Sequence, residues 1–288
     1  MSAAPAPKVS VVTVNRNNLA GLEKTMASVM GQTYADYEFI VVDGGSTDGS
    51  REAIEVRADK IARWVSEPDQ GVYNAMNKGV RMARGQYVQF LNSGDWLGAP
   101  DVLERIFAGG AFAEDLLYGD ALRPDGQGGF RPWRLADELT VAWFARNNLC
   151  HQSAFYKKEL FDVLGPYDES YQIAADWEFN LRILLARRST RHVPVLVAYY
   201  EGAGISETQP DVSVRERAVI LKRLLPDAVY RDYQRLHFLE KECRRLKEFE
   251  DWAAQIRERN LLANYAMATY WAWLKLKRSL TRKEGHKP

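Results

Sequence analysis

The strongest constraint on the fold is a succession of short apolar runs that alternate with helix-like segments in the first hundred residues. The run VSVVTV is β-branched and uninterrupted, as in a strand that is buried on both faces. Such strands alternating with helices predict a mostly parallel sheet that is covered by helices on both sides, which is an α/β fold. The expected strands are Val9–Val14, Glu38–Val42, Ile61–Val65 and Gln86–Leu91; the expected helices are Leu19–Met30, a helix that Ser46 or Thr47 caps and that ends near Ala58, and Val72–Ala83.

The pattern becomes less regular after Pro100. We expect strands at Leu116–Asp120, Phe130–Leu135, Ser153–Tyr156 and His192–Tyr199, with Gly126–Gly129 as a hairpin turn and an amphipathic helix at Asp176–Arg187. From Asp211 onward the chain reads as helical with a break at Pro226. The predicted organisation is therefore a loose arm (1–7), a main α/β domain (8–210, with halves 8–99 and 100–210) and a helical C-terminal extension (211–288).

Charge and cysteine content restrict the class of protein. The segment from Val212 to the end carries 18 Lys and Arg against 10 Asp and Glu, whereas the first 211 residues carry 21 against 28. An acidic body with a basic tail is not the pattern of a nucleic-acid-binding domain, and it suggests a polyanionic partner for the tail. The two cysteines, Cys150 and Cys243, lack metal-ligand spacing and favour a reducing compartment. No run reaches the ~18 apolar residues of a membrane-spanning helix.

Polar side chains stand at the ends of all four predicted parallel strands. Thr13 and Asn15 follow the first strand, Asp43 the second, Asp69 the third and Asp95 the fourth. Each alone is most simply a turn or cap residue. Ligands of such sheets bind at the carboxyl ends of the strands, so these polar side chains taken together predict one binding crevice.

The motifs of several enzyme classes are missing. The sequence has no GxGxxG after the first strand, no GxxxxGK[ST] and no GxSxG, which disfavours dinucleotide, P-loop and serine-hydrolase chemistry. Transfer of a sugar from a nucleoside diphosphate needs a cation at the diphosphate and a carboxylate that accepts the proton of the attacking hydroxyl. Asp95, on a Ser-Gly turn, suits the cation, and Asp176 could face the donor from the acceptor side, although it could also be a helix cap.

Three segments resemble the donor half of family-2 glycosyltransferases, which have the GT-A fold. They are VSVVTVNRN (9–17), SVMGQTYADYEFIVVDGGSTDGS (28–50) and SEPDQGVYNAMNKGVRMARGQYVQFLNSGD (66–95). The segment AADWEFNLR (174–182) is similar to the part of the family that bears the catalytic base. The DQGVYNAMNKG and FLNSGD segments resemble most those of bacterial enzymes of polysaccharide or colanic-acid-type biosynthesis.

The resemblance implies a metal-dependent, inverting transfer from a nucleoside diphosphate sugar, expected to be UDP-linked, to a hydroxyl of a glycan or lipid-linked acceptor in cell-surface polysaccharide synthesis. One departure concerns the DXD motif of the family, which is Ser93-Gly94-Asp95 here, so that only the second carboxylate remains to bind Mn²⁺ or Mg²⁺. The implied roles are contacts to the nucleoside for Thr13, Asn15 and Asp43, to base or phosphate for Asp69 and Lys78, to ribose and metal for Asp95, and general base for Asp176.

Other assignments remain open at this point. His151 and Trp177 are candidates for acceptor contacts, or else structural side chains of the core. The segment 264–283 reads as an interfacial helix with a cationic end, or as a helix that packs on protein; membrane association would place the enzyme at the cytoplasmic face of the inner membrane. Tyr233–Arg259 is a candidate helical hairpin or coiled coil, which leaves homo-oligomerisation open.

Two rival functions are considered. The missing carboxylate at Ser93 would suit a non-catalytic glycosyltransferase-like scaffold of a membrane-associated assembly. A sugar-phosphate nucleotidyltransferase is disfavoured, because Asn15-Arg16-Asn17-Asn18 does not match the Gly-rich, basic triphosphate loop of that class.

Overall fold

The computed structural model describes residues 5–109, 112–144, 147–202, 204, 208–259 and 269–274. Contacts divide the chain into two compact units, Met1–Pro226 and Asp227–Pro288, and each is described by itself. The division falls after Pro226, so that the helix α9 (Pro210–Leu224), which we expected to begin the extension, is part of the first unit.

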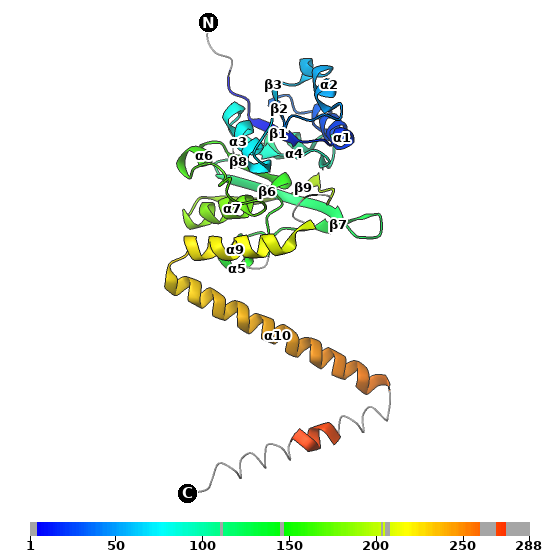
Figure 1. Cartoon of the computed structure of the whole chain (residues 1–288), viewed down its shortest axis with the longest axis vertical. Helices are drawn as coiled ribbons and strands as arrows, with labels where there is room; N and C mark the ends of the chain where they lie inside the picture. The colour runs from blue at the N-terminus through cyan, green and yellow to red at the C-terminus, as the bar shows by residue number, and fades with distance from the viewer. Residues whose placement is uncertain are drawn as a thin grey trace. The chain divides into compact units, whose positions relative to one another are not determined.

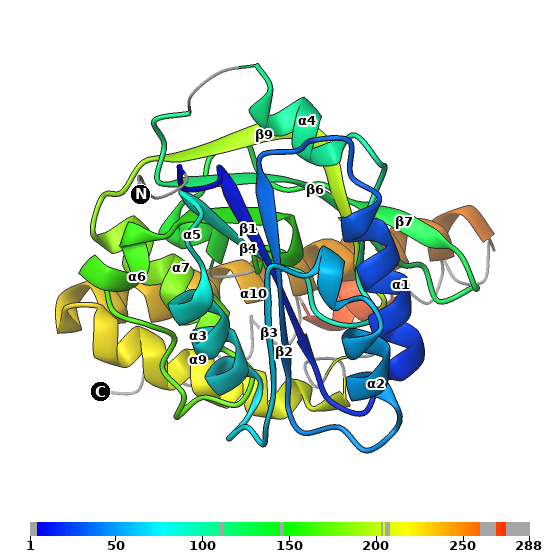
Figure 2. The ribbon, with the colours of Figure 1, turned by 90° about the horizontal axis from the view of Figure 1, so that it is seen from above.

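Four parallel strands form one half of the sheet in the first unit, in the order β3-β2-β1-β4. β1 is in register with β2 from Val9 opposite Tyr37 to Asn15 opposite Asp43, which aligns the carboxyl ends of the two strands. Helix α3 lies on one side of these strands and helices α1 and α2 on the other (Figure 2). The elements are β1 (Val9–Asn15), α1 (Leu19–Met30), β2 (Tyr37–Asp43), α2 (Ser50–Glu55), β3 (Arg63–Ser66), α3 (Val72–Met82) and β4 (Tyr87–Phe90).

The second half of the sheet continues the order as β8-β6-β9-β5, with β7 paired to β6. Strands β6, β7, β8 and β9 of this half are labelled in Figure 1. β8 joins β4 antiparallel, β6 and β9 run parallel, and β6 and β7 form the expected hairpin. The elements are β5 (Trp96–Leu97), α4 (Val102–Phe107), β6 (Leu116–Pro124), β7 (Phe130–Trp133), α5 (Val141–Phe144), β8 (Ala154–Lys157), α6 (Glu159–Val163), α7 (Ala175–Leu185) and β9 (Thr190–Tyr199), with 3₁₀ turns at Ala58–Lys60 and His151–Ser153.

The two faces of β1 are buried against different helices. Val9 and Val11 belong to the apolar core that also contains Leu22 and Met26 of α1. Val12 points to the other face, where α3 approaches so closely that a Cβ on Gly79 would lie 2.3 Å from Val12 Cγ1. Burial on both faces explains why the strand reads as a continuous apolar run rather than an alternating one.

One predicted cap is wrong. Ser46 and Thr47 do not begin the second helix; α2 begins at Ser50, after Gly49, whose φ of 93° is favourable only for glycine. The hydroxyl of Ser46 instead donates to Asp43 Oδ1 at 2.5 Å. The Asp-Gly-Gly segment therefore makes a wider loop after β2 than a helix cap at Ser46 would allow.

The second unit contains one long helix, α10 (Asp227–Arg259), which is 33 residues long. The hairpin that we considered for Tyr233–Arg259 is therefore excluded, because this segment is a single continuous helix. Most of the expected interfacial segment 264–283 lies outside the described residues. The described part of this segment, residues 269–274, is helical. Within the part of the chain that the structure describes, no helix has both the length and the apolarity needed to cross a membrane.

Candidate active site

Two adjoining cavities open at the carboxyl ends of the parallel strands. The first, here called the Asp95 cavity, has a volume of about 390 Å³ and also contains Asp176 in its wall. The second, the Asp69 cavity, has a volume of about 500 Å³ and contains Asn15 and Asp69 in its wall. The cavities share a common wall, formed by Val72, Tyr73, Asn92, Ser93 and Gln172. The crevice predicted from the strand ends is thus present, and it extends toward α7.

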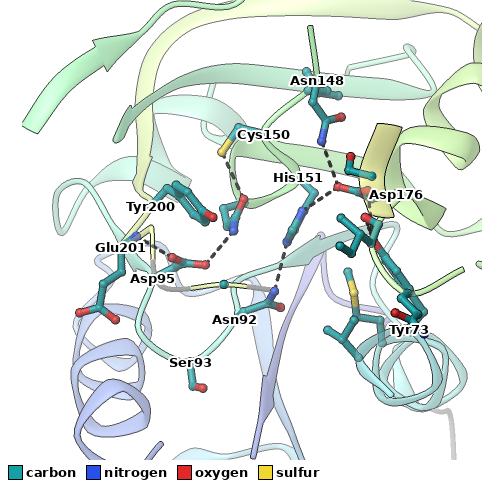
Figure 3. Close-up of a pocket in the computed structure, with 18 of the residues that line it drawn as sticks. Tyr73, Asn92, Ser93, Asp95, Asn148, Cys150, His151, Asp176, Tyr200 and Glu201 are labelled. Carbon is teal, nitrogen blue, oxygen red and sulfur yellow. Dashed lines mark hydrogen bonds and ion pairs between the residues drawn. The ribbon is translucent and has the colours of Figure 1, made fainter. Parts of the chain in front are cut away.

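Asp95 lies on a turn that is attached to α1. Gly94 has a φ of 104°, and its N–H donates to Thr25 Oγ1, while the Thr25 hydroxyl donates to the Asp95 carbonyl at 2.6 Å. The carboxylate accepts hydrogen bonds from Gln152 Nε2 at 2.7 Å and from the Glu201 backbone N–H at 2.9 Å (Figure 3). Burial raises the pKa of Asp95 to about 6, because these two neutral donors only partly offset the loss of hydration.

Asp176 lies across the Asp95 cavity in the first turn of α7, and its residue is only 4% exposed. Tyr73 Oη donates to Oδ1 at 3.1 Å, and Asn148 Nδ2 donates to Oδ2 at 3.5 Å. Asp176 is not the helix cap that we considered as an alternative: the capping position is Ala174, and the Asp176 side chain accepts the N–H of Trp177. Asp176 therefore satisfies one N–H of the first turn of α7 and also lines the wall of a polar cavity, where its second oxygen is available for chemistry.

His151 connects the two sides of the cavity. Its Nδ1 lies 3.1 Å from Asp176 Oδ2, and its Nε2 lies 3.2 Å from Asn92 Nδ2 (Figure 3). Burial alone would raise the pKa of Asp176, but the hydrogen bond and the charge of His151 outweigh it and hold that pKa below its ordinary value. The Asp176 carboxylate is therefore ionised at neutral pH. His151 contacts a proposed catalytic group directly, which neither of our sequence-based interpretations of it anticipated.

Asp43 is fully buried and lies behind the wall of the Asp69 cavity. Its carboxylate accepts hydrogen bonds from Asn15 Nδ2 at 2.8 Å, from the Ser66 hydroxyl at 2.6 Å, and from the N–H and hydroxyl of Ser46. Burial would raise the pKa of Asp43, yet these bonds lower it below its ordinary value. Asp43 thereby fixes Asn15, which does reach the cavity. Thr13 is also fully buried and does not line either cavity.

Asp69 is at the cavity wall, whereas Lys78 is not. Asp69 Oδ1 accepts the N–H of Gly71 at 3.0 Å, and Arg16 lies 4.0 Å away. Its other oxygen is so close to Gly44 that a Cβ there would lie 2.2 Å from it. Lys78 instead pairs with Glu67 at 2.8 Å and stays outside both cavities.

Trp177 is buried in the core. It is 1% exposed, and its indole N–H lies 3.3 Å from the carbonyls of Phe144 and Asn147. A ring in this position offers no face to a sugar, so that the geometry favours the structural interpretation of Trp177 over the acceptor contact.

The cavity residues that the sequence analysis missed include Tyr73, Asn92, Gln152 and Glu201. Tyr73 and Asn92 lie inside the quoted DQGVYNAMNKG and FLNSGD segments, and Gln152 follows His151, so that their neighbours were the available signal. Glu201 follows the last strand and had no such signal. Its carboxylate lies over the Ser93–Asp95 turn, because a Cβ on Gly94 would be 2.3 Å from Glu201 Oε2. Lys24 Nζ is 3.6 Å from Glu201 Oε1.

The residues present are compatible with a hard divalent cation that is held mainly by its substrate. Asp95 and Glu201 both line the Asp95 cavity, and the raised pKa of Asp95 shows that its negative charge is poorly compensated by the protein alone. Among the described residues no cluster of three or more His, Cys, Asp or Glu could enclose a metal ion. Magnesium in particular is commonly bound by one or two carboxylates together with substrate phosphates.

Comparison with known proteins identifies the family. The sequence model of glycosyl transferase family 2 matches residues 10–163. A PGL/p-HBAD biosynthesis glycosyltransferase of Mycobacterium bovis (strain BCG / Pasteur 1173P2) is 37% identical over 226 residues, which cover 76% of this chain and 87% of the relative. This match extends beyond the region of the family model and spans most of the first unit.

Solved structures confirm the fold. S. aureus TarS 1–349 in complex with UDP-GlcNAc has a TM-score of 0.63 at 17% identity, covering 78% of this chain and 70% of that one. The mannosyltransferase PcManGT from Pyrobaculum calidifontis, in complex with GDP-Man and Mn²⁺, has a TM-score of 0.61 at 18% identity, covering 96% and 84%. The GT-A fold expected from the sequence is thus confirmed. The family model and the mycobacterial relative together show that the chain belongs to glycosyltransferase family 2.

Proposed function

We propose that this glycosyltransferase moves a sugar from a nucleoside diphosphate donor to a hydroxyl of a glycan or lipid-linked acceptor, with inversion at the anomeric carbon. The observation that supports this most is that Asp95 and Asp176 line the same cavity from opposite sides. One carboxylate is suited to the cation and diphosphate, and the other to the acceptor. A single base on the far side of the sugar is the requirement of a single-displacement reaction.

In this proposal the donor spans both cavities. The nucleoside occupies the Asp69 cavity, where Asn15 and Asp69 offer hydrogen-bonding groups, and Asp43 supports that wall from behind by holding Asn15. Thr13 is buried behind the strand end and makes no contact with the nucleoside in this proposal. The diphosphate crosses the common wall toward Ser93 and Asp95. Lys78 acts through the loop that it anchors at Glu67 and Pro68, rather than by contact.

A divalent cation, Mg²⁺ or Mn²⁺, would be held by Asp95, with Glu201 as a second carboxylate near the turn. When bound, such an ion neutralises charge that develops on the leaving diphosphate. Glu201 lies beside Gly94, the residue after Ser93, and Ser93 is the position at which the family motif has its first carboxylate. This arrangement weakens the main argument for a non-catalytic scaffold, which rested on the missing charge at Ser93.

Asp176 would act as the general base. As the acceptor oxygen forms its bond to the anomeric carbon, its proton passes to Asp176, and the bond between that carbon and the diphosphate oxygen breaks with the electron pair leaving on the nucleoside diphosphate. Tyr73 and His151 hold the two carboxylate oxygens in fixed directions. Such fixed orientation lowers the cost of reaching the reactive geometry.

The relatives support a nucleoside diphosphate sugar as donor and a glycolipid as acceptor, but they do not decide between UDP and GDP as the nucleotide. TarS was solved with UDP-GlcNAc and PcManGT with GDP-Man and Mn²⁺, while the mycobacterial relative is named for PGL/p-HBAD biosynthesis. We infer UDP from the resemblance of the donor half, and a glycolipid or polysaccharide precursor as acceptor. Action at the cytoplasmic face of the inner membrane, with segment 264–283 on the lipid, completes this proposal.

A donor screen tests the proposed function. Purified protein is incubated with UDP-, GDP- and dTDP-sugars and Mn²⁺, and release of the nucleoside diphosphate is measured together with thermal stabilisation by UDP, GDP or dTDP plus Mn²⁺. The proposal expects stabilisation and slow, metal-dependent hydrolysis with one nucleotide class. Stabilisation without turnover, even in the presence of extracts containing glycolipid acceptors, would support the scaffold instead.

A further inference from the structure

The long helix α10 carries a narrow apolar stripe along one side. Val229, Leu236, Leu239, Cys243 and Leu246, here called the α10 stripe, are all exposed; the three leucines are 45%, 50% and 64% exposed. Their spacing of seven, three, four and three residues places them at a and d positions of a heptad repeat, in which Asp232 occupies the d position between Val229 and Leu236. The helix that presents them is about 50 Å long at 1.5 Å per residue.

The width of the stripe indicates the kind of partner. A helix that packs on a globular domain usually has a broad apolar face, whereas an a/d-only stripe is the seam of a coiled coil. The positions that flank Leu236 to Leu246 carry charges, at Arg235, Glu240, Glu242 and Lys247. Glu242 also pairs with Arg245 of its own helix at 3.1 Å, and the next flanking position is the apolar Phe249. In water, helices depend on burying such a face for most of their stability. These features point to a second helix of matching length rather than to a broad docking surface.

The charges select both the partner and its direction. In a parallel, in-register pair of identical helices, the g position of one helix faces the e position of the next heptad in the other. This brings Arg235 to Glu240 and Glu242 to Lys247 of the other copy, so that each contact joins opposite charges and occurs twice. A second copy of this chain is therefore electrostatically complementary to α10.

An antiparallel pair does not have this complementarity. When the leucine layers are matched, with Leu236 opposite Leu246 and Leu239 opposite Cys243, equivalent flanking positions face one another. Glu240 then meets Glu240, and Glu242 meets Glu242, of the other copy. Like charges in direct opposition are unfavourable, which disfavours this orientation.

We propose that α10 forms a parallel two-stranded coiled coil with α10 of a second copy, and that the glycosyltransferase acts as a homodimer. The seam consists of the α10 stripe, and the two charge pairs set its register. Cys243 occupies an a position, so that the two Cys243 thiols face each other across the axis and provide a direct probe of register.

The test begins with the full-length protein in sedimentation velocity at micromolar concentration. The proposal expects a dimer that Leu239→Glu converts to monomer. Phe238→Glu is the matched control, because Phe238 is also apolar and 61% exposed but occupies a c position, on the side of the helix away from the stripe; it should remain dimeric. Circular dichroism and donor hydrolysis show that both variants are folded. A monomeric wild-type protein, a higher oligomer, or equal loss of dimer in both variants would overturn the proposal.

Direction and register are tested separately. Mild oxidation with diamide should give a covalent dimer on a non-reducing gel, and Cys243→Ser should abolish it, since the other cysteine, Cys150, is buried. Glu242→Lys should raise the dissociation constant of the dimer several-fold, and adding Lys247→Glu should restore it. Dimers that do not cross-link through Cys243, or for which the double substitution fails to rescue, would contradict the parallel arrangement.

Discussion

Replacement of Asp95 by asparagine should abolish donor binding and, in the metal-free protein, remove a pH-dependent cost of folding. Burial raises the pKa of Asp95 from an ordinary value of 3.8 to about 6. A group whose pKa is higher in the folded than in the unfolded state favours folding below the unfolded pKa, and this contribution is lost as the pH rises through the folded pKa. At neutral pH this difference between the folded and unfolded pKa of Asp95 destabilises the wild-type fold by about 3 kcal/mol. An uncharged asparagine does not carry this cost.

The loss of hydrogen bonds in Asp95→Asn changes the free energy of folding by an amount that does not depend on pH. The carboxylate accepts from Gln152 Nε2 and from the Glu201 N–H, and an amide group would present an N–H to one of these donors. Gln152 can compensate by turning its own amide, because the Cys150 thiol is the one group among the described residues that donates to its side-chain oxygen. A residual cost of about 1 kcal/mol is expected for the weaker of the two bonds. The absolute stability of Asp95→Asn therefore depends on two opposing effects, but its pH dependence does not.

Urea unfolding of both proteins in EDTA at about pH 5 and about pH 8 measures this difference. Relative to wild type, the variant should gain about 1.5 kcal/mol between these two pH values, roughly half of the full effect. The same variant should no longer be stabilised by UDP and Mn²⁺. A stability difference that stays constant with pH, or that moves in the opposite direction, would refute the assignment of Asp95 as a buried, poorly compensated carboxylate.

Three further substitutions probe the remaining parts of the site. Ser93→Asp restores a second carboxylate beside Asp95 and should tighten Mn²⁺-dependent UDP binding about tenfold by calorimetry, with no change expected if the cation binds elsewhere. His151→Asn removes the charge that lowers the pKa of Asp176, so that the acidic limb of the pH profile of kcat/KM should move to higher pH; an unchanged limb would exclude this coupling. Gly44→Ala should displace Asp69 and weaken nucleotide binding several-fold while the protein stays folded, and wild-type affinity would remove Asp69 from the donor site.

The first half of the fold could be predicted because its signals are local. β1, β2 and α1 match the expected segments within one or two residues, since strands that are buried on both faces appear as uninterrupted apolar runs. The short strand β5 could not be found in this way. It contains two residues and exists because it pairs with β9, about a hundred residues later.

The sequence allowed us to predict which residues line the candidate site, but not which of them contact one another. Sequence reasoning selected Asp95, Asp176 and Asn15, and the structure places all three on cavity walls. It could not predict that Asp43 acts from behind Asn15, or that His151 pairs with Asp176. Both depend on how the chain returns: β8 lies antiparallel beside β4, and this carries His151 to the end of the parallel strands.

The central claim, that Asp176 is the base of a nucleotide-sugar transfer, is tested most directly by measuring chemistry and donor binding in the same variant. Asp176→Asn keeps the size of the side chain and its contact with Tyr73. With the best donor from the screen, we predict that transfer and donor hydrolysis fall by at least about a hundredfold, the usual contribution of a general base. The calorimetric dissociation constant for UDP and Mn²⁺ should stay within about twofold of wild type. Turnover near the wild-type rate with intact UDP binding would contradict the account.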